Sequence, residues 1–125
     1  MTTMKNNQSF SLRGRSKSVK YALDGVLTFF KEEHNARIHL VATIIVVFLA
    51  IGLSVSTGEA IALTLSVGFV WVAEIFNTAI ERMMDFISTE NDARIKVIKD
   101  LAAAAVLVSA FIAIVTGCFV FIPKL

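Results

Sequence analysis

Four polar side chains follow one another at helical spacing in the segment AEIFNTAIERMMD, residues 73–85. They are Glu74, Asn77, Glu81 and Asp85, and on a helix that advances about 100° per residue they fall within a sector of about 80°. A carboxylate inside a bilayer costs at least about 2.5 kcal/mol, so charges in an apolar segment usually face a protein interior and have a function. The spacing therefore predicts one polar stripe, with Glu74 deepest in the membrane.

Carboxylates and an amide at a boundary between water and lipid are suited to phosphoryl transfer. Mg²⁺ prefers a few carboxylate oxygens together with substrate phosphates, and the transfer needs a base near the accepting hydroxyl. The deepest glutamate would then meet a lipid hydroxyl, and the shallower groups would meet the nucleotide. The sequence has no G-x-x-x-x-G-K-[ST] loop and no soluble-kinase signature, so an ATP site here would not be a P-loop.

Two other interpretations of the stripe stay open on spacing alone. Polar groups can set the register of helices in an oligomer without any chemistry. Acidic groups in membranes also build relays, so a small proton-conducting or ion-conducting assembly fits the same residues.

The composition indicates a membrane protein of one domain. The chain has 125 residues, of which 56% are hydrophobic and 18% charged, and this lies outside the usual range for a soluble domain. The net charge is only +2, which does not indicate a nucleic-acid binder. Cys118 is the single cysteine, so neither an intrachain disulfide nor a thiolate metal cluster can form.

Three segments are long and apolar enough to cross a membrane. Residues 40–58 carry no charge over 19 positions, which nearly matches a hydrocarbon core of about 30 Å. The second apolar segment continues through the polar stripe, and the third is uncharged until Pro123, where a further helical turn is disfavoured. We predict spans at about 36–56, 59–87 and 92–122.

Caps and charges indicate how these spans are connected and oriented. Ser56 and Glu59 form a possible capping box for the second span, and Asn91 or Asp92 can cap the third. Seven Lys and Arg residues precede the uncharged residues 40–58 of the first span, none lies in the turn after it, four lie from Arg82 to Lys99, and the last is Lys124. The positive-inside rule then places the N-terminus and the second loop in the cytoplasm, and the C-terminus outside.

A fourth helix is expected before the first span, over about residues 16–33. Its apolar residues follow a helical pattern from Val19 to Phe30, with lysines on the opposite side, which is typical of a helix on a membrane surface. Packing on protein alone is the alternative. Residues 1–15 are predicted to be a disordered tail and residues 16–125 a single domain. The predicted fold class is an all-α membrane protein, with an N-terminal amphipathic surface helix followed by three transmembrane helices.

Two further polar patches are expected near the stripe. Lys96, Lys99 and Asp100 precede four alanines at 102–105, and small residues let helices approach closely. The stripe and this patch should therefore converge at one interface. The other patch, at residues 32–37, precedes the first span.

At these residues the sequence resembles the prokaryotic diacylglycerol kinase family, which includes undecaprenol kinases. The similarity covers about residues 16–121 and is carried by the strings KYALDGV, EEHNARIHL, EIFNTAIERMMD and KVIKDLAAAAVL. The resemblance implies a lipid kinase of the bacterial inner membrane, usually a homotrimer, with shared active sites at the cytoplasmic face. The implied reaction uses MgATP to convert diacylglycerol to phosphatidic acid, or, as the alternative, undecaprenol to its phosphate.

The resemblance also implies roles for individual residues. Glu74 corresponds to the general base that takes the proton from the lipid hydroxyl. Glu33 and Glu81 correspond to the pair that binds Mg²⁺ of MgATP. The residues implied around the nucleotide are Tyr21, Glu33, Asn77, Glu81, Glu90, Asn91, Asp92, Lys99 and Asp100. Contacts with the lipid are expected from Arg15, Arg37 and Glu74.

The sequence departs from the family pattern at two positions. Gly14 stands where some members carry an arginine that contacts substrate, and Arg13 or Arg15 would have to replace it. His39 stands where the diacylglycerol-specific branch has an acidic residue. We expect His39 to pack or contact head groups at the interface rather than to bind a metal, and Trp71 to pack between helices.

Overall fold

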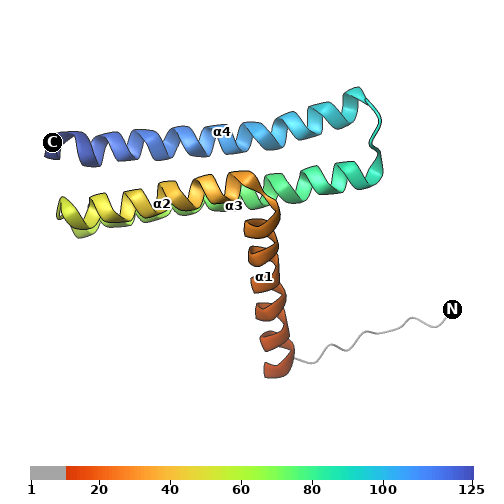
Figure 1. Ribbon diagram of the computed structural model, residues 1–125, viewed down its shortest axis with the longest axis horizontal. Coiled ribbons are helices and arrows are strands. Elements are labelled where there is room, and N and C mark those ends of the chain that lie inside the picture. The colour runs from red at the N-terminus through yellow and green to blue at the C-terminus, as the bar shows by residue number, and fades with distance from the viewer. Residues whose placement is uncertain (1–10) are drawn as a thin grey trace. The chain divides into compact units, whose positions relative to one another are not determined.

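The computed structural model describes residues 11–125 and contains four α-helices, with no strand in this range. They are α1 (Leu12–Glu32), α2 (His34–Gly52), α3 (Thr57–Ile87) and α4 (Ala93–Phe121), and a short 3₁₀ helix, η1 (Ile122–Lys124), follows them (Figure 1). The chain divides into two compact units, Met1–Glu33 and His34–Leu125. The predicted all-α fold is confirmed.

The first unit contains the amphipathic helix α1. The Ser11 hydroxyl accepts a hydrogen bond from the Gly14 N–H at 3.0 Å, and this cap lets the helix start earlier than the predicted residue 16. It ends where Glu33 takes an extended conformation, with φ −106° and ψ 121°. The apolar side chains Val19, Leu23 and Leu27 are exposed, as a membrane-facing stripe requires. Residues 1–10 of the predicted disordered tail lie outside the described residues.

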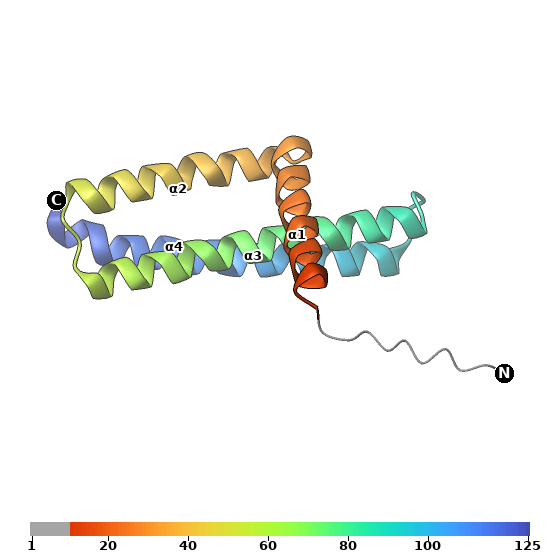
Figure 2. The ribbon, with the colours of Figure 1, turned by 90° about the horizontal axis from the view of Figure 1, so that it is seen from below.

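The second unit consists of three helices that are long and apolar enough to cross a membrane. Their candidate spans are His34–Gly52, Thr57–Ile87 and Ala93–Lys124. The helices lie side by side, and consecutive helices run in opposite directions (Figures 1 and 2). This confirms the three predicted spans, and the first ends at Gly52 rather than near residue 56.

The turn between α2 and α3 explains this earlier end. Ser54 has a φ of 52°, and the Val55 N–H donates to the Ala50 carbonyl at 3.1 Å, which is the pattern of a Schellman motif. The predicted capping box then starts α3. The Ser56 hydroxyl accepts from the Glu59 N–H at 3.2 Å, and the Glu59 carboxylate accepts from the Ser56 N–H at 3.5 Å.

Helix α3 buries one face, and the polar stripe belongs to that face. Its buried residues, which follow one another at intervals of three, four or seven, are Leu63, Ser66, Val70, Glu74, Asn77 and Met84. Helix α4 packs along α3, and its buried positions include the small residues Ala102 and Ser109. Small side chains permit this close approach.

An ion pair joins the start of α3 to the end of the chain. The Nζ atom of Lys124 lies 3.3 Å from Oε2 of Glu59. This pair lies at the opposite end of α3 from the polar stripe. It therefore provides residues that can serve as matched controls for substitutions in the stripe.

Candidate active site

The burial of the polar stripe decreases steadily along α3. Glu74 is 4% exposed and Asn77 is 9% exposed. Glu81 is half-buried and Asp85 is exposed. The sequence predicted the same order for depth in the membrane, with Glu74 deepest, and that prediction concerns the membrane rather than burial in the protein.

The buried carboxylate of Glu74 has a histidine partner on α2. The Nε2 atom of His39 lies 2.8 Å from Oε1 of Glu74, and their side chains are 25% and 5% exposed. An ionised carboxylate can only accept hydrogen bonds, so with Glu74 ionised Nε2 must carry the proton and donate it. The sequence predicted packing or head-group contacts for His39, and its partnership with Glu74 was missed.

Further contacts hold His39 in place. The indole N–H of Trp71 donates to the Thr43 hydroxyl at 3.0 Å, and this hydroxyl donates to the carbonyl oxygen of His39 at 2.7 Å. The rings of His39 and Trp71 meet edge to face, with centroids 6.4 Å apart. Trp71 therefore packs between helices, as predicted, and also contributes to a polar network.

Asn77 and Glu81 are the next two polar groups along the stripe. The Oδ1 atom of Asn77 is buried and has no hydrogen-bond partner among the described residues, which is unusual because buried polar atoms are nearly always bonded. An unsatisfied amide oxygen and a half-buried carboxylate on one face are ligand types that suit Mg²⁺. Within residues 11–125, no three His, Cys, Asp or Glu side chains gather to hold a metal. Asn77 and Glu81 do supply oxygen donors of the kind that Mg²⁺ binds together with substrate phosphate oxygens.

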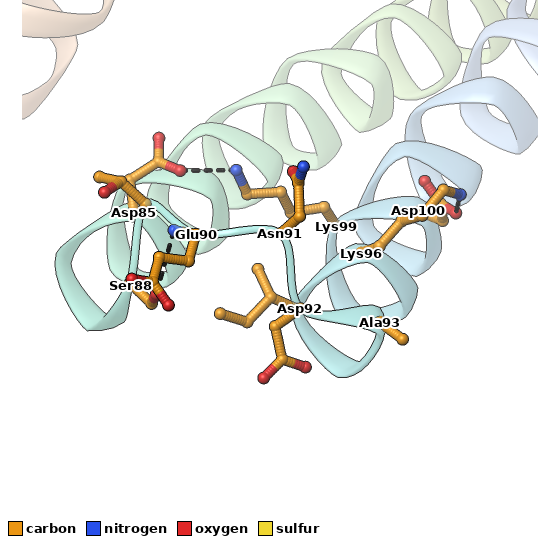
Figure 3. A pocket seen from close by; sticks show the side chains of 11 residues that line it. Asp85, Ser88, Glu90, Asn91, Asp92, Ala93, Lys96, Lys99 and Asp100 are labelled. Carbon is orange, nitrogen blue, oxygen red and sulfur yellow. Dashed lines mark hydrogen bonds and ion pairs between the residues drawn. The ribbon is translucent and has the colours of Figure 1, made fainter.

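A polar cavity of 480 Å³ lies where α3 passes into α4 (Figure 3). Lys99 on α4 donates to Asp85 on α3, with Nζ 2.5 Å from Oδ1. Lys96 and Asp100 form a second pair, also at 2.5 Å. Both pairs are at least partly exposed. The predicted convergence of the stripe with the start of α4 is thus present.

The loop at this cavity contains Glu90, Asn91 and Asp92. Glu90 and Asn91 are exposed, whereas Asp92 caps α4 by accepting from the Arg94 N–H at 2.8 Å. The side chain of Arg94 also bonds to Asp92, and this contact together with the backbone bond lowers the pKa of Asp92 below its ordinary value of 3.8. Of the two predicted caps, Asp92 is the one used.

An apolar cavity of 370 Å³ lies between the three helices of the second unit. Its lining includes His39, Thr43 and Trp71, and the remaining side chains are hydrophobic apart from Gly117. His39 is the one residue of this lining with an ionisable side chain. The histidine thus has Glu74 as its hydrogen-bond partner and also borders an apolar space.

The remaining predicted site residues lie closer to the N-terminus. Arg15 and Tyr21 are exposed on α1, and Glu33 is half-buried at the end of α1, all in the first unit. Arg37 is exposed in the first turns of α2, in the second unit. The roles assigned to these four residues stay predictions.

Comparison with known proteins identifies the family. The family model described as prokaryotic diacylglycerol kinase matches residues 20–121. An undecaprenol kinase from Bacillus subtilis is 33% identical over 109 residues, covering 87% of this chain and 89% of that protein. A diacylglycerol kinase from Escherichia coli is 32% identical over 102 residues, covering 82% and 84%. One from Synechocystis is 32% identical over 109 residues, covering 86% and 62%. The chain belongs to the prokaryotic diacylglycerol kinase family.

Proposed function

We propose that this protein transfers the γ-phosphoryl group of ATP to the hydroxyl of a membrane lipid, with Glu74 as the base. Diacylglycerol, which would give phosphatidic acid, is the favoured acceptor, and undecaprenol is the alternative. The observation that carries the proposal is a buried carboxylate within an apolar span, on one helix face with Asn77 and Glu81. Membership of the family makes lipid phosphorylation the natural use of such a group.

The depth of each group supports this assignment. The ion pair between Glu59 and Lys124 suits one boundary of the membrane, because two charges there avoid the hydrocarbon. At 1.5 Å per residue, Glu74 lies about 22 Å further along α3 and Glu81 about 33 Å further. A hydrocarbon core of about 30 Å would thus include Glu74 near its opposite edge and leave Glu81 outside, where a nucleotide can reach.

The reaction then follows from these positions. The Glu74 carboxylate takes the proton from the lipid hydroxyl while the hydroxyl oxygen attacks the γ-phosphorus of ATP. The bond between the γ-phosphorus and the bridging oxygen breaks, and ADP leaves. Lys99 is suited to neutralise phosphate charge, because its partner Asp85 is exposed and a phosphate oxygen can take the place of that carboxylate.

Mg²⁺ is the cation that fits this chemistry. The resemblance to the family, rather than the geometry, assigns Glu81 and Glu33 to hold it. The bound ion would supply positive charge to the phosphate oxygens during transfer. Asn77 would contribute its otherwise unsatisfied carbonyl oxygen to the same region, toward the nucleotide or its cation.

The remaining assignments concern the nucleotide, the lipid and the assembly. Tyr21 and the loop residues at 90–92, with Asp100, would surround the nucleotide, while Arg15 and Arg37 would meet the lipid head group. We place this end of the bundle in the cytoplasm and the protein in the bacterial inner membrane, because Lys and Arg concentrate there. A homotrimer with shared sites is proposed from the resemblance to the family, and self-association would also help three spans to enclose so polar a site.

A lipid kinase assay tests the proposal directly. The purified protein in detergent receives Mg²⁺ and radiolabelled ATP with either diacylglycerol or undecaprenol, and phosphorylated lipid is separated and counted. Wild type should phosphorylate at least one of these lipids, and Glu74→Gln should lower the rate by about 10²-fold to 10⁴-fold, as removal of a general base does. The ratio of rates on the two lipids decides the acceptor.

Glu59→Gln is the matched control for this assay, because it makes the same change on the same helix at the far end. It should keep nearly full activity. Transfer to neither lipid by a folded wild-type protein would refute the kinase proposal. Equal activity of Glu74→Gln and wild type would refute only the proposed role of Glu74 as the base, and the kinase proposal would stand.

A further inference from the structure

We propose that His39 is a positioning residue for Glu74. Its imidazole would hold one carboxylate oxygen by the hydrogen bond of 2.8 Å, so that the other oxygen faces the hydroxyl of the acceptor lipid. This inference rests on the proposed function, since it takes Glu74 as the base. It assigns a task to a histidine for which the family resemblance implies none.

The first support is the isolation of the Glu74 carboxylate. Glu74 is 4% exposed, and His39 is its one hydrogen-bond partner in the part of the chain that the structure describes. A carboxylate buried to this degree needs a donor to offset its desolvation. With only one such donor, the direction of that single bond sets the orientation of the carboxylate.

The second support is that the donor itself is fixed. Thr43 bonds to the backbone carbonyl of His39 one turn away, and it also accepts from Trp71, which lies one turn before Glu74 on α3. The indole ring packs edge to face with the imidazole. Two side-chain hydrogen bonds therefore join α2 to α3 about one helical turn apart, one from His39 to Glu74 and the other from Trp71 to Thr43.

The third support is the surroundings of the pair. His39 borders the apolar cavity of 370 Å³ between the helices, and a hydrogen bond is electrostatically stronger beside such a low-dielectric space than in water. A general base acts efficiently only when it stays within hydrogen-bond reach of the proton. A misplacement of about 1 Å can lower a rate by about 10²-fold.

Substitutions at position 39 separate positioning from mere packing. His39→Leu removes the donor and keeps an apolar side chain of similar size, and it should lower kcat by about 10-fold to 100-fold, with KM for MgATP changed by less than about 2-fold because nucleotide contacts are untouched. His39→Gln places an amide N–H near the position of Nε2, and it should recover most of the lost rate. His34→Leu, the same change on the same helix, is the control and should resemble wild type.

Two further measurements make the outcome decisive. Thermal unfolding of each variant in detergent shows whether His39→Leu is folded, and if it is not, the comparison of His39→Gln with wild type decides. The double variant His39→Leu/Glu74→Gln should be no slower than Glu74→Gln alone, because His39 acts through Glu74. An additive further loss would contradict this dependence.

The failure of this inference differs from failure of the proposed function. If wild type phosphorylates no lipid, the proposed function fails and the inference falls with it. If wild type is active and Glu74→Gln is not, the function stands, and an unchanged kcat in His39→Leu overturns the inference alone. Equal losses in folded His39→Leu and His39→Gln would also overturn it, because the donor would then not matter.

Discussion

Two polar contacts join neighbouring helices at similar distances but in different surroundings. His39 and Glu74 approach within 2.8 Å between α2 and α3, with side chains that are 25% and 5% exposed. Lys99 and Asp85 approach within 2.5 Å between α4 and α3, with side chains that are 35% and 58% exposed. The two contacts differ in exposure rather than in distance. We call the contact between His39 and Glu74 the inner contact and the contact between Lys99 and Asp85 the outer contact.

This difference determines how easily each contact can exchange partners. Water can solvate both members of the outer pair, and exposed ion pairs contribute only about 0–1 kcal/mol. At the inner contact, loss of one partner leaves a buried polar group unsatisfied, which costs about 1–3 kcal/mol or more. The inner contact is therefore suited to keep one geometry, and the outer contact is suited to release a lysine to a phosphate.

Glu81 lies on α3 between the two contacts. Its substitution shows whether this residue acts with the inner region around Glu74, where the lipid is proposed to react, or with the outer region around Lys99, where the nucleotide is proposed to bind. Glu81→Gln keeps the size of the side chain and removes a charge that we assign to Mg²⁺. The Mg²⁺ concentration for half-maximal activity should rise by about 10-fold to 100-fold, the usual cost of weakening a metal site. A titration of Mg²⁺ at fixed ATP and lipid measures this change.

Glu59→Gln at the other end of α3 should leave the Mg²⁺ requirement unchanged. If Glu81→Gln instead raises KM for the lipid and needs no additional Mg²⁺, then Glu81 belongs to the inner region. The boundary along α3 between residues that act on the lipid and residues that bind the nucleotide would then lie beyond Glu81, closer to the loop between α3 and α4.

Features that depend on residues close in the chain could be predicted from the sequence. The positions of Glu74 and Asn77 on one face follow from the helical period, and the structure buries both. The caps at Ser56 and Asp92 follow from hydrogen bonds within three residues, and the structure contains both. These features could be predicted because a regular helix fixes the relative positions of residues that are only a few positions apart.

Contacts between helices were harder to predict, because they depend on how each helix is rotated. His39 and Glu74 are 35 residues apart, and α2 is apolar on nearly all sides beyond His39, so no period indicates which side faces α3. The convergence of Asp85 with the start of α4 was predictable because a short loop joins them. The sequence did not predict that Asp85 would pair with Lys99 rather than with Lys96.

Removal of the lysine tests the outer contact. Lys99→Met keeps much of the apolar stem and removes the charge, and KM for MgATP should rise by about 10-fold, which corresponds to about 1.4 kcal/mol, with kcat changed by less than about 3-fold. Kinetics at several salt concentrations should show weaker salt dependence than wild type, because a partly exposed charge is screened by ions. Lys124→Met is the matched control at the far end of the bundle.

The opposite pattern would break the comparison between the two contacts. If Lys99→Met lowered kcat strongly and left KM for MgATP unchanged, the outer lysine would act in the transition state. The contact between Lys99 and Asp85 would then have to keep one fixed geometry, as the inner contact does.

The smallest effect is expected at Asp92, which shapes the loop of the outer region without a buried partner. The side chain and N–H of Arg94 lower its pKa below 3.8, so the folded state binds the Asp92 proton less tightly than the unfolded state. The resulting stabilisation is complete above the unfolded pKa and is lost as pH falls through the lower folded pKa.

Asp92→Asn keeps a capping oxygen but cannot ionise. Its Tm should therefore be slightly below that of wild type at pH 7, and the difference should shrink as the pH falls below about 4 and vanish only below the lower folded pKa. Thermal unfolding followed by circular dichroism at several pH values measures it, and a difference that persists in acid would show that the charge of Asp92 does not stabilise the loop.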